Sequence, residues 1–168
     1  SAKDNDHAFA MMNELTADRP LLQARLASAS SAASALPQVD SERMAAIGFC
    51  FGGLCVLDMA RCGLPLAGVA SFHGLLAAPG NTQGNAVHSK VLVEHGWDDP
   101  MVSPEQVLEF AAEMREANAD WQLHAHGDTV HSFTNPAADN KAGGSAYDRL
   151  ADARSWNSLQ FFLQELFA

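Results

Sequence analysis

Cys50 stands at the centre of a glycine-rich stretch, Ala46-Ile47-Gly48-Phe49-Cys50-Phe51-Gly52-Gly53. A short apolar run over residues 44–49 leads into it, as expected of a buried parallel strand. This pattern is typical of a nucleophile elbow, a sharp strand-to-helix turn with small residues two before and two after the nucleophile. A helix that begins at Cys50 would stabilise a thiolate there and an oxyanion beside the Phe51 N–H. The alternative is a tight turn around a buried structural cysteine.

A cysteine nucleophile needs a base and a third group that orients the base. The segment Gly96-Trp97-Asp98-Asp99-Pro100 carries two aspartates that could orient a histidine. Because proline keeps the preceding residue extended, Asp99 is the better fixed of the two, although an Asp turn that caps the next helix is an alternative. His131 lies in a predicted loop, where catalytic residues are common. The predicted triad is therefore Cys50, Asp99 and His131.

Other side chains compete for a place in the site. His73 ends a predicted strand at the same rim as Cys50, so it is either a site residue or an ordinary hydrogen-bonding one. His124 and His126 share one face of a predicted strand, but no third ligand is evident and a structural role is favoured over a metal site. Two aromatic residues of the same segments are further candidates for the substrate site: Trp97 and Phe133.

Composition excludes several classes of protein. The 168 residues suit one domain, and a formal charge of −10 with scattered Lys and Arg residues argues against nucleic acid. With no apolar run of membrane-spanning length and no signal-like start, we expect no membrane partner and a cytoplasmic location. Cys50, Cys55 and Cys62 share one short segment, which favours neither a disulfide framework nor a zinc site. We expect a small-molecule substrate, with no cofactor and no metal.

The elements that must position these residues follow from periodicity. Residues 1–36 predict two helical segments with a break at Asp18-Arg19-Pro20, and the Ala/Ser-rich stretch 27–35 is either the end of the second helix or a flexible linker. Strands are predicted at 44–49, 66–72, 90–95 and 121–126, helices at 50–60, 103–118 and 146–167, and a long loop at 127–144. Alternating strands and helices predict an α/β fold with a parallel sheet covered on both faces.

The chain order nucleophile, acid, histidine is that of α/β-hydrolases. Three motifs in this order, Gly48-Phe49-Cys50-Phe51-Gly52-Gly53, His95-Gly96-x-x-Asp99-Pro100 and His131-Ser132-Phe133, resemble the signatures of the dienelactone hydrolase family over nearly the whole chain. The resemblance implies an α/β-hydrolase fold, a Cys-Asp-His triad and hydrolysis of an ester or lactone. It also implies that the residue after the cysteine, Phe51, donates to the oxyanion.

Two departures from the family shape the expectation. Family members have an N-terminal part of the sheet, with a second oxyanion donor, before the first helix of this chain. We therefore expect one three-layer α/β-hydrolase-like domain over residues 1–168, with a mainly parallel sheet and an N-terminal truncation. The exposed sheet edge predicts a homo-oligomer or a swapped dimer. An arginine of the dienelactone-specific enzyme is replaced by Thr134-Asn135-Pro136, which argues against chlorinated dienelactone.

The sequence thus predicts a hydrolase that cleaves an ester or lactone through a thioester on Cys50. Because one oxyanion donor would be missing, the 168-residue form is expected to be poorly active. Two other classes stay open. One is a truncated, non-catalytic domain that keeps the elbow, and the other is a redox-responsive thiol protein that uses Cys50 with Cys55.

Overall fold

A computed structural model, which describes residues 3–168, contains one four-stranded parallel sheet in the order β1-β2-β3-β4. Its strands are β1 (Ala45–Phe49), β2 (Gly68–Phe72), β3 (Lys90–Gly96) and β4 (Trp121–His126). All four lie where alternation and apolar runs predict them. The α/β class, the parallel sheet and the α/β-hydrolase-like arrangement are therefore confirmed.

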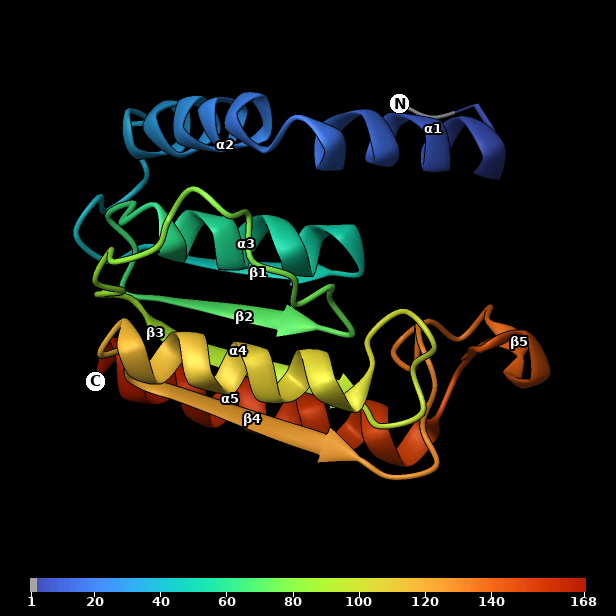
Figure 1. Ribbon diagram of the computed structural model, residues 1–168. Coiled ribbons are helices and arrows are strands. Elements are labelled where there is room, and N and C mark those ends of the chain that lie inside the picture. Colours follow the sequence, from blue (N-terminus) through green and yellow to red (C-terminus); the bar gives the residue numbers. More distant parts are fainter. Residues whose placement is uncertain (1–2) are drawn as a thin grey trace.

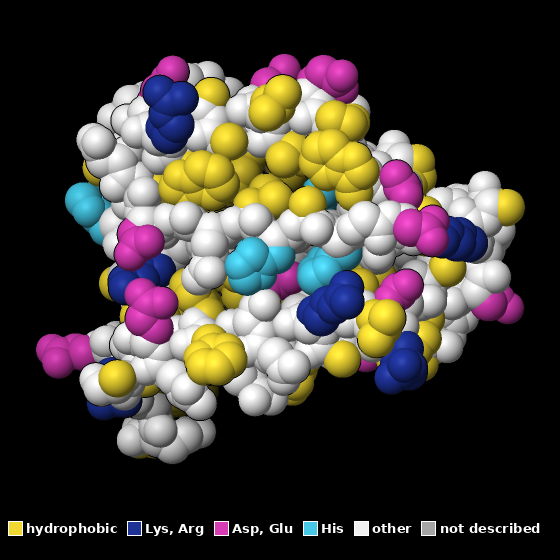
Figure 2. Space-filling model, turned by 90° about the horizontal axis from the view of Figure 1, so that it is seen from below, with side chains coloured by type: hydrophobic (Ala, Val, Ile, Leu, Met, Phe, Trp, Pro, Cys, Tyr) yellow, Lys and Arg dark blue, Asp and Glu magenta, His cyan; other side chains and the backbone are white. Residues whose placement is uncertain are grey.

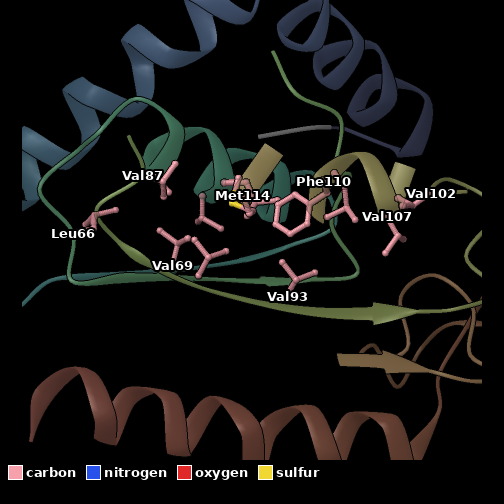
Figure 3. Packing of buried hydrophobic residues seen from close by; sticks show 13 residues of the cluster. Leu66, Val69, Val87, Val93, Val102, Val107, Phe110 and Met114 are labelled. Carbon is pink, nitrogen blue, oxygen red and sulfur yellow. The ribbon is translucent and has the colours of Figure 1, made fainter. Parts of the chain in front are cut away.

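Residues 3–168 also form five α-helices: α1 (Asn5–Ala17), α2 (Arg19–Ser34), α3 (Phe51–Arg61), α4 (Pro104–Glu116) and α5 (Arg149–Phe167). Helices α3 and α4 cover one face and α5 the other, while α1 and α2 form an outer row beyond α3 (Figures 1 and 3). Asp18 ends α1 and caps α2, where its side chain accepts the Leu21 N–H at 3.0 Å. The predicted break is confirmed, and the stretch 27–35 is helical up to Ser34 rather than a linker.

Apolar clusters lie on both faces of the sheet. Figure 3 shows the larger one, in which Val69 and Val93 of the sheet pack near Phe110 and Met114 of α4. The smaller cluster joins the sheet to α5 through Ala70, Phe72, Leu92, Leu159 and Phe162. Because both faces of the sheet are buried, β2 and β3 appear in the sequence as continuous apolar runs. The same packing holds in place the strand ends that carry the site.

Several elements differ in detail from the prediction. Cys50 is the N-cap of α3 rather than its first residue. Helix α5 begins at Arg149 instead of residue 146, because the Asp148 side chain accepts the N–H groups of Leu150 and Ala151 at 2.9 and 2.8 Å. The predicted loop 127–144 contains a 3₁₀ turn, η1 (Lys141–Gly143), which separates two short paired strands, β5 (Asp139–Asn140) and β6 (Ser145–Ala146).

Some apolar surface stays uncovered in the part of the chain that the structure describes. β1 pairs only with β2, and Ile47 and Phe49 of this edge strand are exposed. Figure 2, which views the molecule from below the view of Figure 1, shows hydrophobic side chains gathered on this lower face. The self-association expected at the β1 edge stays a prediction.

None of the helices described over residues 3–168 has the length and apolar character needed to cross a membrane.

Candidate active site

Cys50 occupies a strained turn between β1 and α3. Its backbone has φ 54° and ψ −120°, a conformation that residues other than glycine rarely adopt, and its N–H donates to the Phe72 carbonyl at 3.0 Å. A Cβ at Gly48 would lie 1.9 Å from the Gly52 carbonyl oxygen, so any larger residue at position 48 would clash with the backbone of the turn. This geometry is that of the predicted elbow, and it leaves the Cys50 side chain at the open start of α3.

The second small-residue position of the elbow differs from the prediction. A Cβ at Gly52 would meet nothing within 4 Å, whereas one at Gly53 would lie 2.5 Å from Ser71 Oγ and 2.7 Å from Gly74 Cα. The steric need on the helix side therefore falls on Gly53, because α3 packs there against the chain that leaves β2.

The loop after β3 brings Asp99, not Asp98, to His131. The Asp99 Oδ2 atom lies 2.7 Å from His131 Nδ1, and its Oδ1 accepts the Met101 N–H at 2.9 Å. The Asp99 carboxylate is fully buried, while Asp98 is exposed. Both oxygens of Asp99 are therefore occupied, which fixes the direction in which it holds the imidazole.

His131 is held by the segment that the sequence predicts as loop. Its N–H donates to the Gly144 carbonyl at 3.0 Å, and its own carbonyl accepts the Ala146 N–H at 3.1 Å. Gly144 has φ 82°, and a Cβ there would lie 2.3 Å from Cγ of Pro100. The turn η1 and strand β6 thus clamp the histidine loop onto the aspartate loop.

The electrostatics favour a charged pair between Cys50 and His131. A hydrogen bond to His131 lowers the pKa of the Cys50 thiol against the opposing effect of burial, and the Phe51 N–H lowers it further. Burial lowers the pKa of His131, but hydrogen bonds to Asp99 and Cys50 outweigh it and raise that pKa to about 9. The three residues of the predicted triad are therefore brought together, with the thiolate and imidazolium forms stabilising each other.

The other two cysteines behave differently. Burial, followed by the nearby Asp58 carboxylate, raises the pKa of the Cys55 thiol to about 11, and the same two causes raise the pKa of Cys62. All three cysteines are free. A thiol with a raised pKa is a poor nucleophile at neutral pH, so the chemistry of this helix concentrates at Cys50.

His73 lies against the triad rather than in the open. Its ring centroid is 5.1 Å from that of His131, its Nε2 lies 2.8 Å from Thr134 Oγ1, and 3% of the residue is exposed. Burial, together with the nearby His131, lowers the pKa of His73 to about 4. It is therefore a neutral, hydrogen-bonded neighbour of the base.

The two aromatic candidates for the substrate site are placed less favourably. Phe133 has no exposed surface and packs against His73 and His126, with ring centroids 5.1 and 5.4 Å away. It supports the site from behind, and a contact of Phe133 with substrate stays a prediction. Trp97 is half-exposed and packs edge-on against His95.

Sequence reasoning missed one wall of the site. A hollow of about 430 Å³ opens beside Cys50 and Phe51, and its other lining residues all belong to α1: Ala8, Phe9, Met11, Met12 and Leu15. The apolar spacing of α1 is visible in the sequence, but spacing does not tell which surface an apolar face meets. The hollow gives the site an apolar chamber without a charged side chain in its lining.

The predicted structural role of His124 and His126 is supported by one shared partner. The two carboxylate oxygens of buried Glu94 lie 2.8 Å from His124 Nδ1 and 2.7 Å from His126 Nε2. Within residues 3–168, no group of three or more His, Cys, Asp or Glu side chains could hold a metal ion.

A parallel sheet with an elbow after β1 and an acid and a histidine after β3 and β4 defines an α/β-hydrolase fold. The model of the dienelactone hydrolase family matches residues 1–167, so the chain belongs to that family. A relative from Caenorhabditis elegans, the uncharacterized protein K02A2.1, is 40% identical over 158 residues, which are 92% of this chain and 100% of the relative.

Solved structures agree. The crystal structure of a dienelactone hydrolase-like promiscuous phosphotriesterase, P91 from metagenomic libraries, is 41% identical with a TM-score of 0.86, and the match covers 95% of this chain and 67% of that one. A structure named m3DLH is 36% identical with a TM-score of 0.87, over 99% of this chain and 70% of the other.

Proposed function

We propose that this chain hydrolyses carboxylic esters or lactones with Cys50 as the nucleophile. The observation that carries the proposal is the arrangement of Cys50, His131 and Asp99, in which the thiol pKa is lowered and the imidazole is oriented by a buried carboxylate. Membership of the dienelactone hydrolase family supports ester hydrolysis as the class of reaction.

In the first half of the reaction, the Cys50 thiolate attacks the carbonyl carbon and a C–S bond forms. The carbonyl electron pair moves to oxygen, where the Phe51 N–H and the start of α3, which has no side-chain cap, stabilise the charge. The tetrahedral intermediate collapses as the C–O bond to the alcohol breaks, and His131 protonates the departing alkoxide. The product of this half is a thioester on Cys50.

In the second half, neutral His131 takes a proton from a water molecule that attacks the thioester carbonyl. The C–S bond breaks, the carboxylic acid leaves, and the thiolate and imidazolium are restored. Asp99 accepts the Nδ1–H throughout, which keeps the tautomer that directs Nε2 at the reacting groups.

Two cysteine variants test this proposal. Cys50→Ala removes the attacking atom with little change in volume, so it should abolish hydrolysis of a p-nitrophenyl ester while leaving the circular dichroism spectrum unchanged. Cys55→Ala, the matched change on the same helix, should keep most of the turnover. Full activity in the Cys50 variant, or its loss only in the Cys55 variant, would refute the assignment.

The two rival classes predict different results in the same preparation. A non-catalytic domain would show alkylation of Cys50 by iodoacetamide at neutral pH but no release of p-nitrophenol beyond the label. A redox-responsive thiol protein would form a disulfide between Cys50 and Cys55 under mild peroxide without becoming acylated. A p-nitrophenol burst that is stoichiometric with enzyme and followed by steady turnover supports the hydrolase.

Neutral phosphotriesters are a second candidate substrate, since P91 is described as a promiscuous phosphotriesterase. The hollow beside Cys50 favours them over charged phosphates because its lining carries no cation that would pair with a phosphate anion. Incubation with p-nitrophenyl diethyl phosphate should release p-nitrophenol and add a diethyl phosphoryl group to Cys50. If intact mass shows no such adduct and no p-nitrophenol appears, this second activity is absent.

A further inference from the structure

Helix α1 faces the nucleophile with a continuous apolar surface. Ala8, Met11, Met12 and Leu15 recur at spacings of three and four residues, so they share one side of the helix. Together with Phe9 they line the hollow of about 430 Å³ that Cys50 and Phe51 line from the opposite side. A group attached to Cys50 Sγ has direct access to this space.

A second hollow, of about 260 Å³, lies farther along α1. It is lined by Met12, Asn13, Thr16, Arg19, Leu54, Leu75, Leu76, Ala77, Met101 and Gln106. Leu54 lies one helical turn after Phe51 on α3, so the second hollow continues the first in the direction of that helix. Met12 is the residue that lines both hollows.

The leaving alcohol and the acyl group of an ester go to different sides of this site. The alcohol must reach His131 to be protonated, yet His131 does not line the hollow under α1. The acyl group stays bonded to Cys50 in the thioester and must occupy space next to Sγ. The hollow under α1 adjoins Cys50 and has room for an acyl group bonded to its sulfur.

We propose that α1 forms the acyl pocket and that Met12 is its end wall, which sets the longest acyl chain that the enzyme accepts. The proposal rests on the proposed ester hydrolysis and names its substrates as uncharged esters of unbranched, apolar carboxylic acids. Each methylene buried before the wall is reached should raise kcat/KM about fourfold. Chains that extend past Met12 should lose this gain.

A series of p-nitrophenyl esters with even acyl chains from two to twelve carbons measures the limit directly. In the wild-type protein kcat/KM should rise with length and then fall. Met12→Ala joins the two hollows and should move the maximum to longer chains by at least two carbons, whereas Met12→Phe should move it to shorter ones. Glu14→Ala is the contrast on the same helix, because exposed Glu14 lines neither hollow, and it should leave the maximum in place.

A second readout does not depend on turnover. N-alkylmaleimides of increasing length alkylate Cys50 by addition of its sulfur to the ring double bond, and peptide mapping locates the label. The rate should depend on chain length with the same maximum and the same displacement of that maximum in the Met12 variants. Circular dichroism checks that each variant folds.

The combined outcomes separate the two proposals. If esters are hydrolysed but the chain-length maximum is the same in the wild type and in every variant, the role of Met12 is overturned and the hydrolase assignment stays intact. Length-dependent alkylation that changes with Met12, without turnover of any ester, supports the pocket and refutes the hydrolase. Neither turnover nor length-dependent alkylation overturns both.

Discussion

The two sides of the candidate site differ in how firmly they are held. On one side, Asp99 and His131 are buried and fixed by hydrogen bonds to each other and to the backbone of two loops that clamp together. On the other side, none of the residues from 6 to 17 of α1 is buried, and Phe9 is 55% exposed. The atoms proposed to make and break bonds are rigidly placed, whereas the wall proposed to select the substrate is lightly packed.

One ionic contact ties this lightly packed side to the fold. At the start of α2, Arg19 donates two hydrogen bonds to the buried Asp58 carboxylate, at 2.9 and 2.6 Å. Asp58 lies on α3, the helix that begins at the elbow. The C-terminal end of α1 is therefore anchored near its junction with α2.

The largest loss of activity should come from a change on the side of the site that carries Asp99 and His131. Asp99→Asn would leave the imidazole in the wrong tautomer and should lower kcat on a p-nitrophenyl ester by about 10⁴-fold. Asp98→Asn changes the exposed carboxylate that directly precedes Asp99 in the same loop, and it should keep most of the activity. Equal losses in the two variants would mean that the loop as a whole, not the Asp99 contact to His131, supports turnover.

The pH dependence of Cys50 labelling tests the contact between Cys50 and His131 without a substrate. Because the pKa of Cys50 is lowered from 9.0, the thiolate should persist to lower pH than in an ordinary cysteine, and the midpoint of iodoacetamide labelling should fall below 9. His131→Asn removes the hydrogen bond that is the main cause, so the midpoint should rise. Labelling at pH 7 should then slow, by about tenfold for each pH unit by which the midpoint rises above 7. An unchanged midpoint would assign the low pKa to the start of α3 instead.

A smaller loss of activity is expected from disturbing the turn at Gly144, which holds the His131 loop in place. Gly144→Ala forces an alanine to φ 82° and brings its Cβ within 2.3 Å of Pro100, so it should destabilise the fold by about 1–3 kcal/mol and lower kcat by displacing His131. Gly80→Ala has a similar φ of 79° with open space around the new Cβ. It should cost about 1 kcal/mol in urea unfolding and leave kcat unchanged. If both variants lose activity equally, the clamp does not position His131.

The smallest expected difference is in the rate of amide hydrogen exchange. Amide hydrogens of α1 should exchange faster than those of α3, which buries seven of its residues, because local opening of α1 exposes little apolar surface. Hydrogen exchange followed by mass spectrometry resolves the two helices. Equal protection of the two helices would show that α1 is as firmly fixed as α3 and would contradict the description of α1 as lightly packed.

Local features of this chain could be predicted from the sequence because they depend on neighbouring residues. The elbow follows from the size of Gly48 and the strand that precedes it, and the break between α1 and α2 follows from Asp18 and Pro20. The preference for Asp99 over Asp98 follows from the restriction that Pro100 imposes on the residue before it. In each case sterics or one short hydrogen bond decides the backbone, so no distant contact is needed.

The tertiary structure decided everything that depends on what a surface meets. Gly53 rather than Gly52 carries the steric demand because β2 and its exit loop lie against α3, and Phe133 is buried because it fills the space behind His73. The apolar face of α1 is evident from its spacing, but only the packing of the chain makes Met12 line two hollows, one of them beside Cys50. Periodicity reports that a face avoids water, and it carries no information about the partner that covers it.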